Sequence, residues 1–214
     1  APEGVGRSGS TLGSDMQTAI KENIGIKGRY RLIEADSRLA REEYQALLNF
    51  LERFPIDSIQ TPAGREWHGL KYRALLRAYH EKAAVAERVV DNLIPTVGRT
   101  ALAQRLANTL TYTGVVNYAA IGSGTTAPAD GDTQLGTEVY RQTMSSQTYT
   151  NNIASLSVFI AAGTATGTHT EGGLFIDGTA VADSGQIFSH VLFSPSIVKG
   201  ALNSLTLDIS LTIS

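Results

Sequence analysis

A strict alternation near the C-terminus is the feature that most limits what this chain can fold into. Aliphatic residues occupy every second position and polar residues lie between them: Leu205, Leu207, Ile209, Leu211 and Ile213 against Thr206, Asp208, Ser210 and Thr212. Because side chains alternate between the two faces of a strand, this pattern predicts a β-strand with one face in a core. Further apolar strand patterns lie upstream, at 115–121, 138–143, 153–160, 172–176 and 187–193. We therefore expect an antiparallel β-sandwich, jelly-roll-like or Greek-key in topology, in the C-terminal half.

The two halves of the chain differ in composition. Residues 111–214 hold 2 of the 18 Lys and Arg and 7 of the 20 Asp and Glu, with 28 Ser and Thr and 12 Gly. Residues 1–110 hold the other 16 and 13, so the halves carry net charges of +3 and -5. A change from charge-rich to Ser, Thr and Gly-rich sequence is typical of a change from helices to strands and turns. The chain is therefore predicted to be α+β.

The N-terminal half is predicted to begin with an arm and a strand. Residues 1–23 have little periodicity and several glycines, so we expect a flexible N-terminal arm. Residues 24–36 contain alternating apolar and basic positions and are predicted to form the first strand of the sandwich. The region 92–214 is then predicted to hold a short helix over 98–110 and the rest of the β-sandwich.

An inserted helical hairpin is predicted over residues 37–91. Apolar residues at spacings of three and four predict a helix from Ser37 to Phe54, capped by Ser37 or Asp36 and ended by Pro55. A second helix is predicted to start at Thr61-Pro62 and to run to about Val89. The two helices are expected to pair antiparallel.

Four aromatic side chains of this hairpin are candidate partner contacts, although their spacing also fits a core or subunit interface. They are Phe54, Trp67, Tyr72 and Tyr79.

Composition excludes several classes of function. The chain has no Cys, which excludes disulfides, thiolate nucleophiles, zinc–thiolate sites and iron–sulfur clusters. A net charge of -2 argues against direct binding of nucleic acid by electrostatics. No apolar run approaches the roughly 20 residues that cross a bilayer, so we expect no membrane contact and a soluble protein made in a cytoplasm.

The motif search finds no convincing catalytic or cofactor site. The run from Gly122 to Ala127 has the spacing G-x-G-x-x-A, but a dinucleotide site needs a helix to follow, and Pro128 comes next instead. The pair His169 and Glu171 lacks a third metal ligand, and no G-x-S-x-G motif is present. We expect no cofactor, no metal and no enzymatic activity.

Four charged residues near the sandwich are instead predicted to anchor loops. An arginine fork can hold a loop carboxylate by two parallel hydrogen bonds. The candidates are Arg99 and Arg141 as the forks, with Asp132 and Glu138 as the carboxylates.

Several segments, in order, resemble a known group of proteins. They are NLIPTVGRTALAQRLAN at 92–108, NYAAIGSGTTAPADGDTQLGTEVYR at 117–141, EGGLF at 171–175 and KGALNSLTL at 199–207, with IGIKGRYRLIE at 24–34 resembling the first strand. These segments are similar to small virion proteins of tailed double-stranded DNA bacteriophages. Residues 37–91 depart from that pattern, so we expect the first strand to pack with the C-terminal sandwich across the insertion.

The resemblance implies a non-catalytic structural protein located in the virion. We expect a capsid decoration or cement protein whose arm and helical hairpin bind neighbouring shell subunits, with the major capsid protein as partner and a homo-oligomer as the assembled form. A tail, baseplate or fibre-attachment protein is the alternative, because sandwich modules serve many parts of a particle. A carbohydrate-binding module for host attachment is a further alternative.

Overall fold

A computed structural model describes residues 25–109 and 111–214; the predicted arm over 1–23 lies outside the described residues. The N-terminal elements are β1 (Ile26–Asp36), α2 (Arg41–Arg53), the 3-10 turn η1 (Ile56–Ser58), α3 (Pro62–Ala83), β2 (Ala84–Asp91) and α4 (Thr96–Leu106). The C-terminal strands are β3 (Val116–Gly122), β4 (Glu138–Thr143), β5 (Ser146–Thr150), β6 (Ile153–Ile160), β7 (Gly167–Ile176), β8 (Gln186–Lys199) and β9 (Asn203–Ile213). The chain is therefore α+β.

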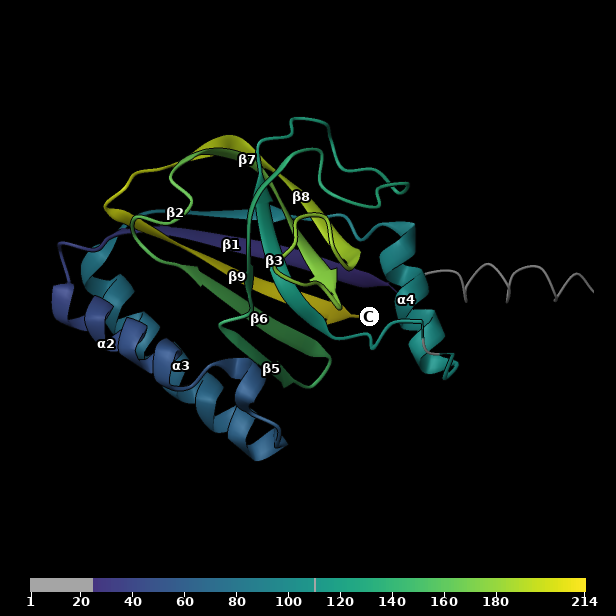
Figure 1. Cartoon of the computed structure of the whole chain (residues 1–214), viewed down its shortest axis with the longest axis horizontal. Coiled ribbons are helices and arrows are strands. Elements are labelled where there is room, and N and C mark those ends of the chain that lie inside the picture. The colour runs from purple at the N-terminus through teal and green to yellow at the C-terminus, as the bar shows by residue number, and fades with distance from the viewer. Residues whose placement is uncertain (1–24, 110) are drawn as a thin grey trace, which may run out of the picture.

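Two antiparallel sheets form the body of the protein (Figure 1). The five-stranded sheet has the order β2-β1-β9-β6-β5, and the four-stranded sheet has the order β4-β3-β7-β8. Their inner faces share one apolar core, to which β1, β6 and β9 contribute from the first sheet and β3, β7 and β8 from the second. This arrangement is compatible with the predicted β-sandwich.

The first strand completes the sheet built by the last strand. β1 pairs with β9 along its whole length, from Ile26 opposite Ile213 to Asp36 opposite Asn203. This pairing confirms the expectation that the first strand packs with the C-terminal half. The alternation of β9 is also confirmed, since Leu205, Leu207 and Ile209 are buried in the shared core.

Helices α2 and α3 lie side by side against the outer face of the five-stranded sheet (Figure 1). Their apolar faces meet at Leu47, Phe50 and Leu76 and cover Phe159 of the sheet. Thr61 caps α3 by accepting a hydrogen bond from the Gly64 backbone N–H, as its sequence predicts for a helix that starts with Pro at the first position.

The part of the sheet that the helices cover carries serine hydroxyl groups beside Phe159, and tyrosines of α3 form hydrogen bonds with these hydroxyls. Tyr72 is hydrogen-bonded to the Ser157 hydroxyl at 2.9 Å, and Tyr79 to the Ser204 hydroxyl at 3.0 Å. Both tyrosines are fully buried. The outward-facing positions of a half-buried strand are thus covered here without leaving their hydroxyl groups unpaired.

The second predicted helix is too long. It ends at Ala83, and residues 84–91 form β2, which pairs with β1 from Ala84 opposite Ala35 to Asp91 opposite Arg29. The segment AVAERVVD also fits a helical pattern, since Val85, Ala86, Val89 and Val90 lie at spacings of three and four. It contains β-branched residues, and the backbone hydrogen bonds of the neighbouring strand decide its structure. The predicted boundary of the helical region at 91 is therefore wrong.

Three smaller differences concern the other elements. The first helix begins at Arg41 with Ala40 as N-cap, because the Asp36 carboxylate instead accepts hydrogen bonds from the Arg38 backbone and side chain. The third helix is shifted toward the N-terminus, to Thr96–Leu106. Strand β5 was not predicted, whereas β4 and β6 have their predicted bounds.

Within residues 25–109 and 111–214, no helix combines the length and hydropathy that crossing a bilayer requires.

Candidate functional site

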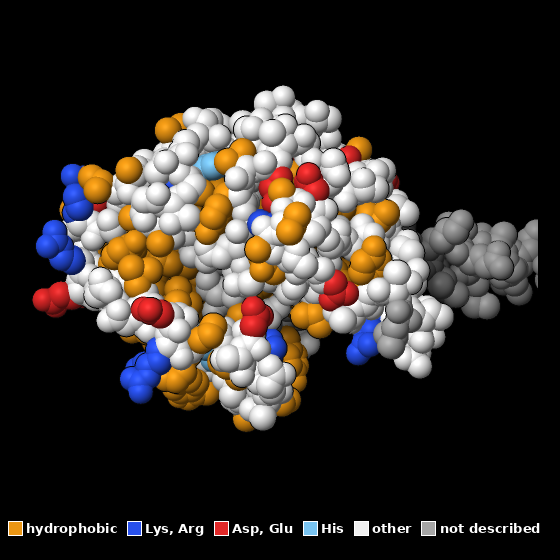
Figure 2. Space-filling model, viewed as in Figure 1, with side chains coloured by type: hydrophobic (Ala, Val, Ile, Leu, Met, Phe, Trp, Pro, Cys, Tyr) orange, Lys and Arg blue, Asp and Glu red, His pale blue; other side chains and the backbone are white. Residues whose placement is uncertain are grey.

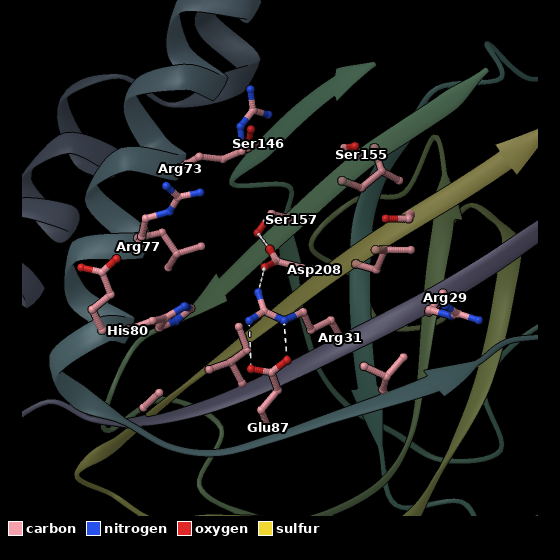
Figure 3. Close-up of a pocket in the computed structure, with 18 residues that line it drawn as sticks. Arg29, Arg31, Arg73, Arg77, His80, Glu87, Ser146, Ser155, Ser157 and Asp208 are labelled. Carbon is pink, nitrogen blue, oxygen red and sulfur yellow. Dashed lines mark hydrogen bonds and ion pairs between the residues drawn. The ribbon is translucent and has the colours of Figure 1, made fainter. Parts of the chain in front are cut away.

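A cleft of about 680 Å³ lies between α3 and the outer face of the five-stranded sheet (Figure 3). Strands β1, β2, β5, β6 and β9 contribute to its floor and sides. The cleft forms because α3 covers only part of the polar face of the sheet. Its volume is in the range of small-ligand sites, which makes it the candidate functional site of the described residues.

Two parallel rows of polar side chains run across the floor of the cleft, and each row crosses strands β1, β9 and β6. In the first row, Arg31 of β1 lies opposite Asp208 of β9, which lies opposite Ser157 of β6. In the second row, Arg29 lies opposite Ser210, which lies opposite Ser155. These are the outward positions of the alternation, so the sequence pattern does place them on one face.

The first row is a connected ion-pair network. Arg31 donates to both carboxylate oxygens of Glu87, at 2.6 and 2.9 Å, and its Nη1 lies 3.8 Å from Asp208 Oδ2. Ser157 donates to Asp208 Oδ1 at 2.6 Å. Arg31 thus forms a bidentate pair with Glu87 and a longer ion pair with Asp208, whose other oxygen accepts from Ser157.

Burial and pairing shift the pKa values in this network. Burial raises the pKa of the Asp208 carboxyl above its ordinary value, although the Ser157 hydrogen bond and the Arg31 charge act in the opposite direction. The hydrogen bond from Arg31 lowers the pKa of Glu87. The two acids that face Arg31 therefore have pKa values shifted in opposite directions.

His80 lies at the helix side of the same network. Its Nε2 is 3.0 Å from the Thr206 hydroxyl. Burial, assisted by the charge of Arg31, lowers the pKa of His80 to about 4. The ring is therefore neutral at pH 7. Its hydrogen-bond partner is a threonine, while Ser157 donates to Asp208, so the cleft does not show the serine–histidine contact of a nucleophilic triad.

The wall formed by α3 carries Arg73 and Arg77, one helical turn apart (Figure 3). Arg73 donates to the Thr148 hydroxyl at 2.8 Å. Among the residues that the structure describes, Arg77 has no ion-pair or hydrogen-bond partner. This wall therefore presents positive charge to the cleft.

The sequence alone does not predict this cleft. The alternation of the last strand places Asp208 and Ser210 on the face opposite the aliphatic residues, but it does not show what covers that face. The signal in the sequence is two pairs of arginines: Arg29 and Arg31 at alternate positions of β1, and Arg73 and Arg77 on successive turns of α3. These pairs indicate one site only once α3 is known to lie across the sheet.

The loop with the G-x-G-x-x-A spacing closes on the buried carboxylate of Glu171. That carboxylate accepts hydrogen bonds from three backbone N–H groups, those of Gly124 at 2.8 Å, Gly136 at 2.9 Å and Thr137 at 2.7 Å. Burial alone would raise the pKa of Glu171, but these three donors and His190 together lower it. The Gly124 amide of the motif is therefore occupied by a side chain of the protein itself.

His190 links Glu171 to the loop from the other side. Its Nε2 lies 3.1 Å from Glu171 Oε2 and its Nδ1 lies 2.7 Å from Asp132 Oδ2. Asp132 also accepts a hydrogen bond from the backbone N–H of Ala129. A Cβ atom at Gly124 would collide with the Glu171 carboxylate, so glycine is required for this close approach.

The four predicted loop anchors take different partners. Arg141 forks onto Glu138 with bonds of 2.5 and 2.7 Å, both side chains are 3% exposed, and Arg141 also donates to the Thr179 and Ser184 carbonyls. Arg99 pairs with Asp130 at 3.0 Å, not with Asp132. Asp132 contacts His190 as described above.

The four predicted partner contacts divide into two pairs. Trp67 is 50% exposed and packs edge-on against half-buried Phe54, with ring centroids 5.4 Å apart. Tyr72 and Tyr79 are 0% exposed, because they occupy the helix face that is turned to the sheet. The contact surface predicted for these two tyrosines is therefore wrong, and both belong to the core.

Within the described residues, no group of three or more His, Asp and Glu side chains is placed to hold a metal ion. Of the four tyrosines in the β half, Tyr149 is 80% exposed and Tyr112, Tyr118 and Tyr140 are partly buried. Comparison with protein-family models, with curated proteins and with solved structures finds no match to this chain.

Proposed function

We propose that this chain is a non-enzymatic structural protein of a tailed-bacteriophage virion, and more specifically a capsid decoration or cement protein. The observation that carries the proposal is the convergence of the phage-like segments on Glu171. Segment 117–141 supplies Gly124, Gly136 and Thr137, and segment 171–175 supplies the carboxylate that binds their amides. These residues serve to rigidify a loop, which suits a load-bearing protein better than a catalyst.

The helical pair α2–α3 is proposed to be an insertion that carries the contact surface. It lies between two strands that are neighbours in the sheet, since Ala35 at the end of β1 pairs with Ala84 at the start of β2. Its free end exposes Trp67 and Leu70, at 50% and 58%. Figure 2 shows hydrophobic side chains gathered over this part of the molecule. An exposed aromatic beside an exposed leucine is a suitable anchor for a protein interface.

The proposed partner is the shell protein of the capsid, and the proposed assembly is a homo-oligomer around a symmetry axis of the particle. The chain has no Cys, so this protein cannot stabilise the particle through disulfide bonds.

The experiment that tests the location is gold labelling of intact and disrupted particles with an antibody against this chain. Label distributed over the head supports the decoration role. Label confined to the tail or its tip overturns that role and supports the tail, baseplate or fibre-attachment alternative. Absence of label from both preparations overturns the virion proposal as a whole.

A binding experiment tests the contact surface. The full chain is added to particles that lack it, and bound protein is measured by sedimentation. Trp67→Ala with Leu70→Ala is expected to weaken binding by about tenfold or more, because interface aromatics carry much of the binding energy. Val181→Ala is the matched control, since Val181 is 70% exposed at another surface. Equal loss in both variants, or none in either, contradicts the proposed surface.

A further inference from the structure

The α3 wall of the cleft holds guanidinium groups with unused hydrogen-bond donors. Arg73 donates once to Thr148, and Arg77 has no partner among the described residues. A guanidinium group has five N–H donors in a planar fork, so most donors of this pair are free. Figure 3 shows Arg77 lying alongside α3 and Arg73 reaching from α3 toward Ser146. Side chains one turn apart lie on the same helix face and can serve one ligand.

Two of the three carboxylates that line the cleft already face an arginine. Glu87 and Asp208 both face Arg31, and Glu81 lies at the helix side of the cleft. On the other side of the floor, Arg29 pairs with Asp91. The α3 wall itself carries Arg73 and Arg77 against Glu81, and this local excess of positive charge favours an anion there.

Hydroxyl groups extend from this wall across the floor. Thr148 lies opposite Ser155 on β5 and β6, and Ser155 lies opposite Ser210 on β9. Ser210 in turn lies opposite Arg29 on β1. The row therefore begins at the Thr148 hydroxyl that Arg73 contacts and ends at Arg29. The serine hydroxyls between them are neutral and can both donate and accept hydrogen bonds.

We propose that this cleft binds a small organic oxyanion: a carboxylate or phosphate group held by Arg73 and Arg77, on a hydroxyl-bearing body that lies over Ser155 and Ser210. A volume of about 680 Å³ accommodates such a ligand. The arginines supply charge-assisted hydrogen bonds to the acid group, and the serine row matches the hydroxyl groups. This site is independent of the virion role, because it needs no particle and uses neither Trp67 nor Leu70.

The test is isothermal titration calorimetry of the full chain at pH 7 with three probes: glucuronate, glucose 6-phosphate and glucose. At least one of the two anionic sugars is expected to bind with a Kd in the millimolar range or below, while neutral glucose does not bind. Binding of glucuronate alone identifies a carboxylate ligand, and binding of glucose 6-phosphate alone identifies a phosphate ligand. Failure of both anions to bind at about 10 mM overturns the proposal.

Two charge variants test the place of binding in opposite directions. Arg77→Gln is expected to weaken binding about tenfold by removing the free guanidinium. Asp208→Asn is expected to strengthen it about threefold, because it removes a negative charge from the floor and keeps an acceptor for Ser157. Lys71→Gln is the matched control, since it removes one exposed positive charge of α3 outside the cleft. An Arg77→Gln variant that binds like the Lys71→Gln variant overturns the assignment to this cleft.

Discussion

Glu171 is the residue on which the long loop between β3 and β4 depends. Its side chain is buried, and its two oxygens accept from three backbone amides in addition to facing His190. A buried carboxylate is stable only when hydrogen-bond donors replace the water that it loses. The loop and the carboxylate therefore satisfy each other, and neither is expected to stay ordered alone.

Glu171→Ala is expected to lower the free energy of unfolding by about 3–5 kcal/mol, because three buried amides lose their acceptor. Urea denaturation measures the loss, and hydrogen exchange at Gly124, Gly136 and Thr137 should increase. Asp130→Ala is the control, because its ion pair with Arg99 is exposed and is worth about 0–1 kcal/mol. Similar losses in the two variants would contradict this role for Glu171.

His80 is expected to make the protein less stable in acid. Its pKa is about 4 in the folded protein, against an ordinary value of 6.5. Between these values the unfolded chain binds more protons than the folded chain, so the free energy of unfolding falls as the pH falls from 6.5 to 4. For this partly exposed group the expected loss is up to about 2 kcal/mol.

Urea denaturation at several pH values checks this expectation. His80→Gln keeps a partner for Thr206 and should remove that part of the acid sensitivity. The control is His169→Gln, at a buried histidine whose ring contacts the Ala165 carbonyl outside the cleft. An unchanged pH profile in His80→Gln would show that His80 does not cause the effect.

At the scale of elements, helix α3 both packs on the sheet and forms one wall of the cleft. Its buried face carries Tyr72, Leu76 and Tyr79, which pack on the sheet, and its neighbouring face carries Arg73 and Arg77. The tyrosine hydroxyls pair with serines on the polar side of the strands. This match explains why tyrosines, and not phenylalanines, occupy these helix positions.

Tyr72→Phe and Tyr79→Phe are each expected to lower the free energy of unfolding by about 1 kcal/mol, because each leaves a buried serine hydroxyl with one hydrogen bond fewer. Tyr149→Phe is the matched control and should change nothing measurable, because Tyr149 is 80% exposed. Thermal or urea unfolding measures all three variants. If the buried variants behave like the control, the helix is not held to the sheet through these hydroxyls.

For the whole molecule, the helical pair occupies the connection between two adjacent strands. The shared core between the two sheets takes Ile56 from the connection between α2 and α3 but no described residue of the two helices themselves. A second cluster joins these helices to Ala35 and Phe159. The sheets are therefore expected to fold without the helices, at a reduced stability.

Replacing residues 37–83 by a short Asn-Gly turn, together with Phe159→Thr on the uncovered face, tests this expectation. The variant should keep the pairing of β1 with β2 and β9, since Ala35 and Ala84 are already opposite each other. Circular dichroism should show strand without helix, and particle binding should be lost. A variant that is unfolded although β1, β2 and β9 are complete would show that the helices are part of one cooperative core.

Local patterns determined much of the fold. The alternation of β9 is strong enough to predict its buried face, and the Thr61-Pro62 start and the three–four spacing predict α3 and α2. These elements are readable because each has an apolar face with its own period. The arginine fork of Arg141 onto Glu138 is also among the predicted pairings of residue types.

The tertiary structure decided what depends on neighbours distant in the chain. Residues 84–91 form a strand because they pair with the edge of β1. The local sequence pattern of this segment does not show that such an edge lies beside it. Tyr72 and Tyr79 are buried because α3 lies across the outer face of the sheet, and the sequence pattern alone does not show that a helix covers this face. Glu171 meets Gly124, 47 positions away, and Asp208 meets Arg31 only through strand register. The cleft exists for the same reason, since its charges come from segments that only folding brings together.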